Sequence, residues 1–349
     1  MQTADQASLT LKVGDLVEVR SAAEILATLD ESGAYESLPF MPEMLRYCGQ
    51  RLTVYKVAHK VCDTQTGTGM RRMDNAVHLT GARCDGGAHD GCQAACLIYW
   101  KTAWLRKVEP GDTDGPVAPI PAPERLLPLL TINSHRVEGD GTKIYRCQAT
   151  ELLRAAPESL PLRDVGQFVR DIRTGNAGVG WTIRTILVAL YNRAQGAGKR
   201  FLPPRMRWRS GRHWGFVRGT ATKTPAVRTD LQPGDVVRVR SKDEIASTLN
   251  SELLNRGMGF DGEMGRFCGH MGRVERRVDR IIDERTGRML QMRNPCIVLE
   301  NVVCEGAYNL NCPRSITPYW REVWLEKVDE ARPQSQDAVS RRRGGSAGV

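Results

Sequence analysis

The side chains of this chain that are best suited to bind a soft metal ion belong to ten cysteines and six histidines. Three cysteines recur 220 positions later in the sequence: Cys48 with Cys268, Cys84 with Cys304, and Cys92 with Cys312. A structural zinc site needs four ligands in a tetrahedral arrangement, usually on loops that can wrap the ion. Three shared cysteines and one local ligand would satisfy that requirement in each half of the chain.

The local ligand differs between the two halves. In the first half it could be Cys62, His89 or Cys96, and in the second half Cys296 or His270. The loop CDGGAHDGCQAAC, residues 84–96, is the densest cluster, so an open metal position is expected there. We therefore predict zinc binding by residues drawn from Cys48, Cys62, Cys84, His89, Cys92 and Cys96, and in the second half from Cys268, Cys304 and Cys312.

The alternative interpretation is that these cysteines are small core residues, because unpaired cysteine is among the most buried residue types. Cys296, in the apolar run PCIVLENVVC, fits that description well. The second site is the weaker prediction, since the second half lacks three polar residues of the first: His59, His78 and Cys62 are replaced by Asp279, Val298 and Ile282.

The cysteines recur because the chain contains two copies of one module. A shift of 220 positions aligns residues 11–108 with residues 231–328 without a gap, and 31 of the 98 aligned positions are identical. The segments EMLRYCG and YWKTAWLRKV, for example, become EMGRFCG and YWREVWLEKV. Each copy is therefore expected to be one structural unit.

The sequence of each module predicts several short strands and one or two short helices. Alternating apolar residues predict a first strand after Gly14-Asp15 and after Gly234-Asp235. The S-x-x-E capping boxes at Ser21 and Ser241 then predict helices over residues 22–29 and 242–249, and second helices are expected over 42–47 and 262–267. The recurring tryptophans near each module's end are expected in its core. We predict a mainly β fold with short helices (α+β), in which two small β-barrel modules flank a mixed, partly helical middle region.

The opening G-D-x-V-x-V-R-S and the closing W-L-x-K-V of each module resemble Src-homology-3-like or KOW-like small barrels. The whole chain is similar to an uncharacterised bacterial family of cysteine-containing tandem-module proteins. Barrels of this type commonly bind nucleic acid or peptides, so the resemblance implies a binding role.

The segments outside the modules differ in composition. Residues 109–126 form a proline-rich linker, and residues 127–192 form a mixed region with helices expected near 148–155, 162–172 and 182–193. Residues 193–230 form a basic, aromatic segment that leads into the second module. The ends, residues 1–10 and 329–349, are expected to be tails, the second of them disordered.

The basic segment accounts for the net charge of the chain. From Arg193 to Arg228 there are ten Lys or Arg and no Asp or Glu, and the formal net charge of the whole chain is +10. Interleaved aromatic side chains could stack on bases while arginines contact phosphates. We predict binding of nucleic acid or an acidic protein through Lys199, Arg200, Arg205, Arg207, Trp208, Arg209, Arg212 and Trp214. The alternative is that this segment packs on an acidic face of its own modules.

The sequence contains few enzymatic motifs. There is no H-E-x-x-H, and the glycines of TGNAGVG, residues 174–180, lack the Lys-Ser/Thr of a phosphate-binding loop. No signal peptide or apolar run of membrane-spanning length is present, so a cytoplasmic protein without a membrane span is expected. We therefore favour a non-catalytic binding or scaffold protein with zinc-stabilised modules. The alternative is a metal- or thiol-dependent enzyme that uses the Cys/His loop of the first module.

Overall fold

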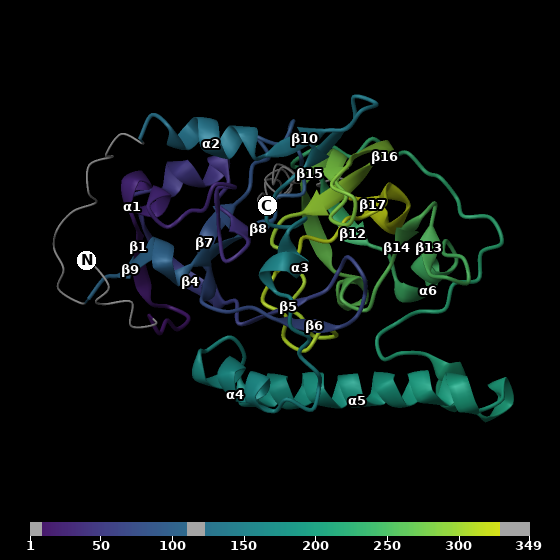
Figure 1. Ribbon diagram of the computed structural model, residues 1–349. Helices are drawn as coiled ribbons and strands as arrows, with labels where there is room; N and C mark the ends of the chain where they lie inside the picture. Colours follow the sequence, from purple (N-terminus) through teal and green to yellow (C-terminus); the bar gives the residue numbers. More distant parts are fainter. Residues whose placement is uncertain (1–8, 110–122, 329–349) are drawn as a thin grey trace, which may run out of the picture.

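The computed structural model describes residues 9–109 and 123–328 (Figure 1). The first module is built on an antiparallel sheet with the strand order β8-β7-β4-β1-β9. Its strands are β1 (Leu16–Val19), β4 (Arg51–Val57), β7 (Ala76–Arg83), β8 (Leu97–Lys101) and β9 (Leu105–Lys107).

The second module has a matching antiparallel sheet with the order β16-β15-β12-β17. Its strands are β12 (Val236–Val239), β15 (Met271–Ile282), β16 (Met289–Leu299) and β17 (Leu325–Lys327). The strand register is the same in both modules: Val17 lies opposite Leu52 and Lys107, and Val237 lies opposite Gly272 and Lys327. Each of these pairings recurs at the 220-residue offset.

The predicted capping boxes are confirmed at both helix starts. Ser21 caps α1 (Ala22–Leu26), and Ser241 caps α6 (Lys242–Ala246). In both cases the serine hydroxyl accepts a hydrogen bond from the backbone N–H three residues on, and the carboxylate of that residue accepts one from the serine N–H. Both helices are shorter than predicted, and they end after little more than one turn.

The expected second helices are 3-10 turns, and short hairpins join the main strands. The 3-10 turns are η1 (Pro42–Tyr47) and η5 (Met264–Arg266), with η2 (Thr102–Trp104) and η6 (Glu322–Trp324) before the last strands. The hairpin strands are β2 (Ala34–Tyr35), β3 (Leu38–Pro39), β5 (Lys60–Cys62), β6 (Met70–Arg72), β13 (Leu254–Asn255) and β14 (Met258–Gly259).

The two sheets curl into half-barrels, and the fold as a whole is a mixed α+β arrangement. Only the three residues of η2 separate β8 from β9, yet these strands form opposite edges of their sheet. The sheet must therefore curl to bring its edges together. No pairing between β8 and β9 is found in the described ranges, so the closed barrels that we expected are seen only as half-barrels.

Tryptophans fill the two cores, as predicted. Trp100 and Trp104 are fully buried in the first module, and both meet the ring of Phe40 edge to face. In the second module Trp320 and Trp324 are fully buried against Phe260 in the same way. Such edge-to-face contacts add a directional preference to the apolar burial.

The middle region lies on two sides of the modules (Figure 1). Helix α2 (Leu126–Ile132) and the hairpin β10 (His135–Val137) to β11 (Lys143–Tyr145) lie on one side, and α4 (Gly166–Arg173) and α5 (Val179–Phe201) lie on the opposite side. Between them comes α3 (Leu152–Ala155), and after α5 come η3 (Pro204–Met206) and η4 (Trp208–Gly211). Across the described ranges, no helix is both long and apolar enough to cross a membrane.

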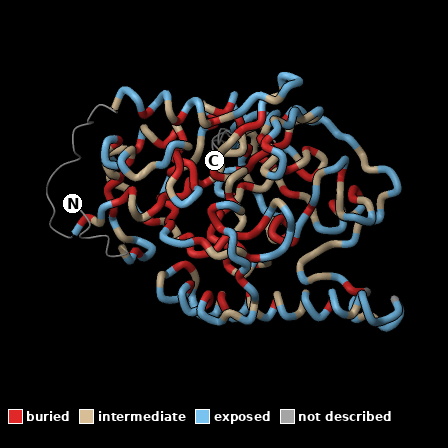
Figure 2. The backbone as a smooth tube through the Cα atoms, in the orientation of Figure 1, coloured by how far each residue is buried: buried red, intermediate tan, exposed pale blue. Residues whose placement is uncertain are grey.

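Helix α5 is much longer than the predicted helix over residues 182–193. It continues through Gly196 and Gly198 to Phe201, so the first part of the basic segment is helical. Most of its surface is exposed (Figure 2). Residues 110–122 of the proline-rich linker lie outside the described residues, as do the C-terminal tail and most of the N-terminal one, and the last linker residue, Leu126, already belongs to α2.

The two modules contact each other reciprocally. The sulfur of Cys312 accepts a hydrogen bond from the backbone N–H of Cys62 at 3.2 Å, and the sulfur of Cys92 accepts one from the N–H of Ile282 at 3.3 Å. Cys92 corresponds to Cys312 and Cys62 to Ile282 at the 220-residue offset. A reciprocal contact of this kind is the mark of a two-fold, isologous interface, here within one chain.

Candidate functional sites

The first candidate site is a buried cluster of Glu43, Cys84 and His89 in the first module. The 3-10 turn η1 positions Glu43, and Cys84 directly follows β7. The chain then turns at Gly86, whose φ is +71°. A Cβ atom at Gly86 would lie 2.0 Å from the carbonyl oxygen of Cys92, so only glycine allows the close turn that carries His89 back to Glu43.

The ligand atoms of the three side chains lie within 4.8 Å of one another. Glu43 Oε1 lies 2.6 Å from His89 Nδ1 and 3.8 Å from Cys84 Sγ. The other ring nitrogen of His89, Nε2, lies 3.2 Å from the carbonyl oxygen of Arg146. Because a carbonyl can only accept, Nε2 carries a proton and Nδ1 faces Glu43. Metal-binding histidines are commonly oriented in this way.

Without a metal, the cluster is a buried ion pair beside a neutral thiol. Burial alone would lower the pKa of His89, but the Glu43 carboxylate outweighs it and raises that pKa. Burial would likewise raise the pKa of Glu43, and the hydrogen bond from His89 reverses the shift. Burial and the Glu43 charge raise the pKa of the Cys84 thiol. A cation that took the place of these protons would stabilise the deprotonated forms of the ligands: neutral imidazole, thiolate and carboxylate.

The cluster also fits a divalent cation in its ligand chemistry. Glu43 Oε2 is buried and has no hydrogen-bond partner within the described structure. Three protein ligands of the nitrogen, sulfur and oxygen types would leave a fourth position open on a tetrahedral zinc ion. Glu43 was missed as a ligand at the sequence level because an acidic residue at the start of a helix also favours the helix dipole. The recurrence of this acidic residue as Glu263 in the second module is the sequence feature that could have identified it.

The other predicted ligands of the first module do not join this cluster. Cys48 packs against the first core, and burial raises its pKa to about 11. Cys62 contacts Cys312 in the second module, and Cys92 accepts a hydrogen bond from Ile282. In the part of the chain that the structure describes, Glu43, Cys84 and His89 are the only group of three or more such ligands that converge. The expected convergence of Cys48, Cys84 and Cys92 is therefore not found.

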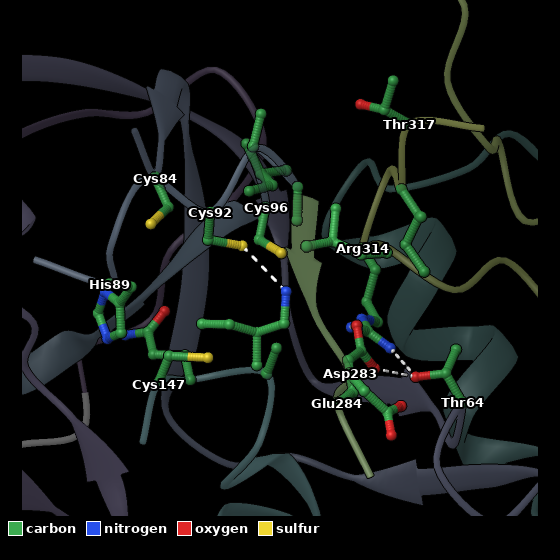
Figure 3. A pocket seen from close by; sticks show the side chains of 18 of the residues that line it. Thr64, Cys84, His89, Cys92, Cys96, Cys147, Asp283, Glu284, Arg314 and Thr317 are labelled. Carbon is green, nitrogen blue, oxygen red and sulfur yellow. Dashed lines mark hydrogen bonds and ion pairs between the residues drawn. The ribbon is translucent and has the colours of Figure 1, made fainter. Parts of the chain in front are cut away.

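The cluster borders a cavity of about 290 Å³ between the modules (Figure 3). Cys84, Cys92, Cys96 and Cys147 line one side of this cavity together with His89, and Arg314, Glu284 and Thr64 line the other side. Burial raises the pKa of Cys96 to about 12 and that of Cys147 to about 11, so both are neutral thiols near pH 7. The position of Cys147 was not predicted, because it belongs to the middle region and has no counterpart in the repeat.

The second module has no equivalent of the cluster among its described residues. Glu263 and Cys304 occupy the positions of Glu43 and Cys84, but Asn309 replaces His89. Glu263 pairs instead with Arg266 at 3.0 Å. Of the predicted ligands there, Cys268 packs against the second core and Cys312 contacts Cys62. The two modules therefore differ in their capacity to bind a metal.

The second candidate site is a groove of about 540 Å³ at the end of α5. Four cationic side chains line it and no acidic one does: Lys199, Arg207, Arg212 and Arg218. His213 and Phe216 complete its polar and aromatic lining. Burial, with Lys199 nearby, lowers the pKa of His213. The groove is therefore a concentrated positive surface that an anion can enter.

The segment that contributes most of this groove also carries exposed aromatic side chains outside its lining. Phe201 is 77% exposed and Trp208 is 73% exposed, values unusual for such large apolar groups. Tyr191 on α5 contacts the rings of both Trp208 and Trp214 edge to face, and the Arg209 guanidinium lies over the Trp214 ring. These contacts hold the Trp208 ring in place while it remains open to solvent.

Among the described residues, no carboxylate forms an ion pair with the cations of the basic segment. None of the ten Lys and Arg side chains from Arg193 to Arg228 forms an ion pair within the described ranges. The recorded ion pairs all involve other cations. The alternative interpretation, in which this segment packs on an acidic face of its own modules, finds no support in these contacts.

The predicted basic residues have different local roles. The Arg207 guanidinium donates to the backbone carbonyls of Lys199 and Leu202, so it caps the carboxyl end of α5. Arg212 donates to the carbonyl of Arg209, while Arg200 lies over the Phe201 ring. Arg205 lies exposed on η3. Arg218, which we did not single out from the sequence, also lines the groove.

No protein-family model, curated protein or solved structure matches this chain. The residues of these two sites therefore have to carry the functional argument.

Proposed function

We propose that this protein is a non-catalytic binding protein that holds single-stranded nucleic acid in the groove at the end of α5. The observation that carries the proposal is the lining of that groove, with four cations and no acid. Side chains that neutralise phosphates supply most of the affinity for a nucleic-acid backbone.

The exposed aromatic residues favour a single strand over a duplex. Unpaired bases can stack on the faces of aromatic rings, whereas the bases of a duplex are already stacked on each other. Trp208 is exposed and is positioned by Tyr191, so its ring is pre-arranged for stacking. The resemblance of the modules to small nucleic-acid-binding barrels adds support by analogy.

Binding of a fluorescently labelled oligonucleotide, measured by anisotropy at low salt, tests the proposal. Trp208→Ala should weaken binding of a single strand by about 1–3 kcal/mol, because one stacking partner is lost. The matched control is Trp181→Ala on the first turn of α5, far from the groove along the same helix. Equal affinity of wild type and Trp208→Ala would contradict the stacking role, and no binding at low salt would remove nucleic acid as the partner.

The Glu43, Cys84 and His89 cluster supports a second, independent function: one zinc ion in the first module. Its basis is the buried and unpartnered Glu43 Oε2 beside a histidine whose other nitrogen is fixed by a carbonyl. With a neutral thiol at each of Cys84, Cys96 and Cys147, the cavity offers no activated nucleophile from these three residues near pH 7. This argues against the thiol-dependent enzyme and leaves metal binding as the use of the cluster.

A further inference from the structure

Cys62 and Cys312 form a pair of thiols that joins the two modules. Cys62 ends strand β5, and Cys312 lies in a loop of the second module, 250 residues away. The backbone N–H of Cys62 donates to Cys312 Sγ at 3.2 Å, and both side chains belong to one small buried cluster. Both are free thiols, with 8% and 5% of their surfaces exposed.

The surroundings of this pair favour thiolate chemistry at Cys62. The neighbouring Cys312 thiol is the main cause that lowers the pKa of Cys62, and the Arg314 guanidinium lowers it further. Arg314 is buried and donates to the carbonyl oxygen of Cys62 at 3.4 Å. A thiol beside a fixed cation and a second thiol has the arrangement of a cysteine pair that can be oxidised.

A cavity reaches Cys312, so a small oxidant can approach the pair from that side. Cys312 lines a cavity of about 320 Å³ that also borders Tyr55, Lys56, Trp181 and Asn311. A cavity of that size accommodates a molecule the size of hydrogen peroxide.

We propose that Cys62 and Cys312 are an oxidation site, at which hydrogen peroxide converts the two thiols into a disulfide that locks the two modules together. The Cys62 thiolate attacks one peroxide oxygen, and the O–O bond breaks to give a sulfenic acid and, after protonation, water. The Cys312 sulfur then attacks the Cys62 sulfur, and the S–O bond breaks to release a second water. The two thiols lose two protons and two electrons in total, and the peroxide takes them up to become two waters.

The proposed disulfide would form where the two modules and helix α4 meet. Lys60, two residues before Cys62, pairs with the buried Asp171 of α4 at 2.6 Å. Asn311, the neighbour of Cys312, donates to the same carboxylate at 3.1 Å. A covalent bond between Cys62 and Cys312 would therefore tie both modules together beside the point where α4 is anchored.

The reciprocal contact provides a control within the same molecule. Cys92 Sγ meets the N–H of Ile282 as Cys312 Sγ meets that of Cys62, but Ile282 offers no second thiol. Cys92 should therefore remain reduced while Cys62 and Cys312 are oxidised. This contrast separates a specific disulfide from general oxidation of exposed or reactive cysteines.

The test treats the folded full-length chain with hydrogen peroxide, blocks remaining thiols under denaturing conditions, and maps peptides by mass spectrometry. We expect one cross-linked peptide pair containing Cys62 and Cys312, which disappears after reduction. The variant Cys62→Ile should abolish the cross-link while keeping the fold, since isoleucine occupies this position in the second module. Cys92→Ser should leave the cross-link intact.

A second variant tests the geometry by introducing a new thiol pair instead of removing one. Ile282→Cys recreates the thiol pair at the reciprocal contact, so it should acquire a second disulfide with Cys92. Wild-type protein in which Cys62 and Cys312 remain thiols, or are oxidised separately without a cross-link, would overturn the proposal. A cross-link between Cys312 and a different cysteine in Cys62→Ile would overturn it as well.

Discussion

Thr64 and Glu284 form a hydrogen bond with each other although they occupy the same position in the two modules, 220 residues apart. A residue can meet its own counterpart only near a local two-fold axis, as in isologous interfaces between subunits. Arg314 lies at this point, 2.7 Å from Thr64 Oγ1 and 2.7 Å from Glu284 Oε1. One buried cation thus joins the two modules where they are most symmetric.

The first prediction concerns the stability of this junction. Arg314→Ala should lower the free energy of unfolding by about 3 kcal/mol, since it leaves a partly buried carboxylate and a buried carbonyl without their donor. Equilibrium urea unfolding measures the change. Arg154→Ala removes an exposed ion pair with Glu151 and should cost less than about 1 kcal/mol. Similar losses in the two variants would contradict the role of Arg314.

The second prediction concerns acid stability and His78. This histidine is fully buried, and burial lowers its pKa to about 4. Between about pH 4 and the ordinary value of 6.5, the unfolded chain binds a proton there that the folded chain does not, so stability falls as the pH falls. His78→Val adopts the residue of the second module and should remove about 1.4 kcal/mol of that loss per pH unit in this range.

Urea unfolding of the wild type and His78→Val at several pH values measures this difference. The free energies of unfolding of the two proteins should converge or cross as the pH falls below 6.5. Only the wild type loses stability by keeping the His78 ring neutral in the folded state. A difference in stability that is the same at every pH would contradict the prediction.

The third prediction concerns metal stoichiometry. Protein purified without a metal-binding tag, loaded with zinc and then dialysed to remove unbound zinc should retain one zinc ion per chain. The reason is that only the first module has the complete cluster. His89→Asn copies the second module and should lose the ion, as should Cys84→Ser. Zinc affinity should rise with pH, since His89 and Cys84 must release protons to bind. Elemental analysis of the dialysed proteins measures the stoichiometry.

Cys48→Ser and Cys92→Ser are the matched controls for the metal site. Both residues recur in the repeat, but neither belongs to the cluster. Two zinc ions per chain, or loss of zinc in Cys48→Ser, would show that the ligands are those suggested by the repeat and not those of the buried cluster.

Local sequence patterns predicted the parts of the fold that depend on local interactions. The helix starts at Ser21 and Ser241 follow from a capping box that operates over four residues, and the buried tryptophans follow from their size and recurrence. The length of α5 was underestimated because Gly196 and Gly198 weaken a helix intrinsically. Arg207 counteracts this by donating to the carbonyl of Lys199, eight residues earlier, in the last turn of α5.

The contacts between modules could not be predicted from one sequence. Spacing groups cysteines by their place in the repeat, which suggested that Cys48, Cys84 and Cys92 converge. The actual neighbours depend on how the two modules dock: Cys62 meets Cys312, and Cys92 meets Ile282. Cys84 and His89, both among the candidate ligands, lie close together because they belong to one loop, and Glu43 joins them only through the turn η1.

The central claim, that the groove at the end of α5 binds a nucleic-acid strand, depends on Lys199 and Arg218. Both line the groove, and neither side chain forms a hydrogen bond or ion pair within the described ranges, so their loss should leave the fold intact. Arg136 and Arg288, which both pair with Glu138 on the opposite side of the molecule, provide the matched control pair.

The most direct test is the salt dependence of oligonucleotide affinity, measured by anisotropy for wild type, Lys199→Gln/Arg218→Gln and Arg136→Gln/Arg288→Gln. Each lost phosphate contact should reduce the log–log slope by about 0.7 for a single strand. We therefore expect a slope smaller by about 1.4 in the groove variant and an unchanged slope in the control. Equal slopes in all three proteins would contradict the proposed binding site.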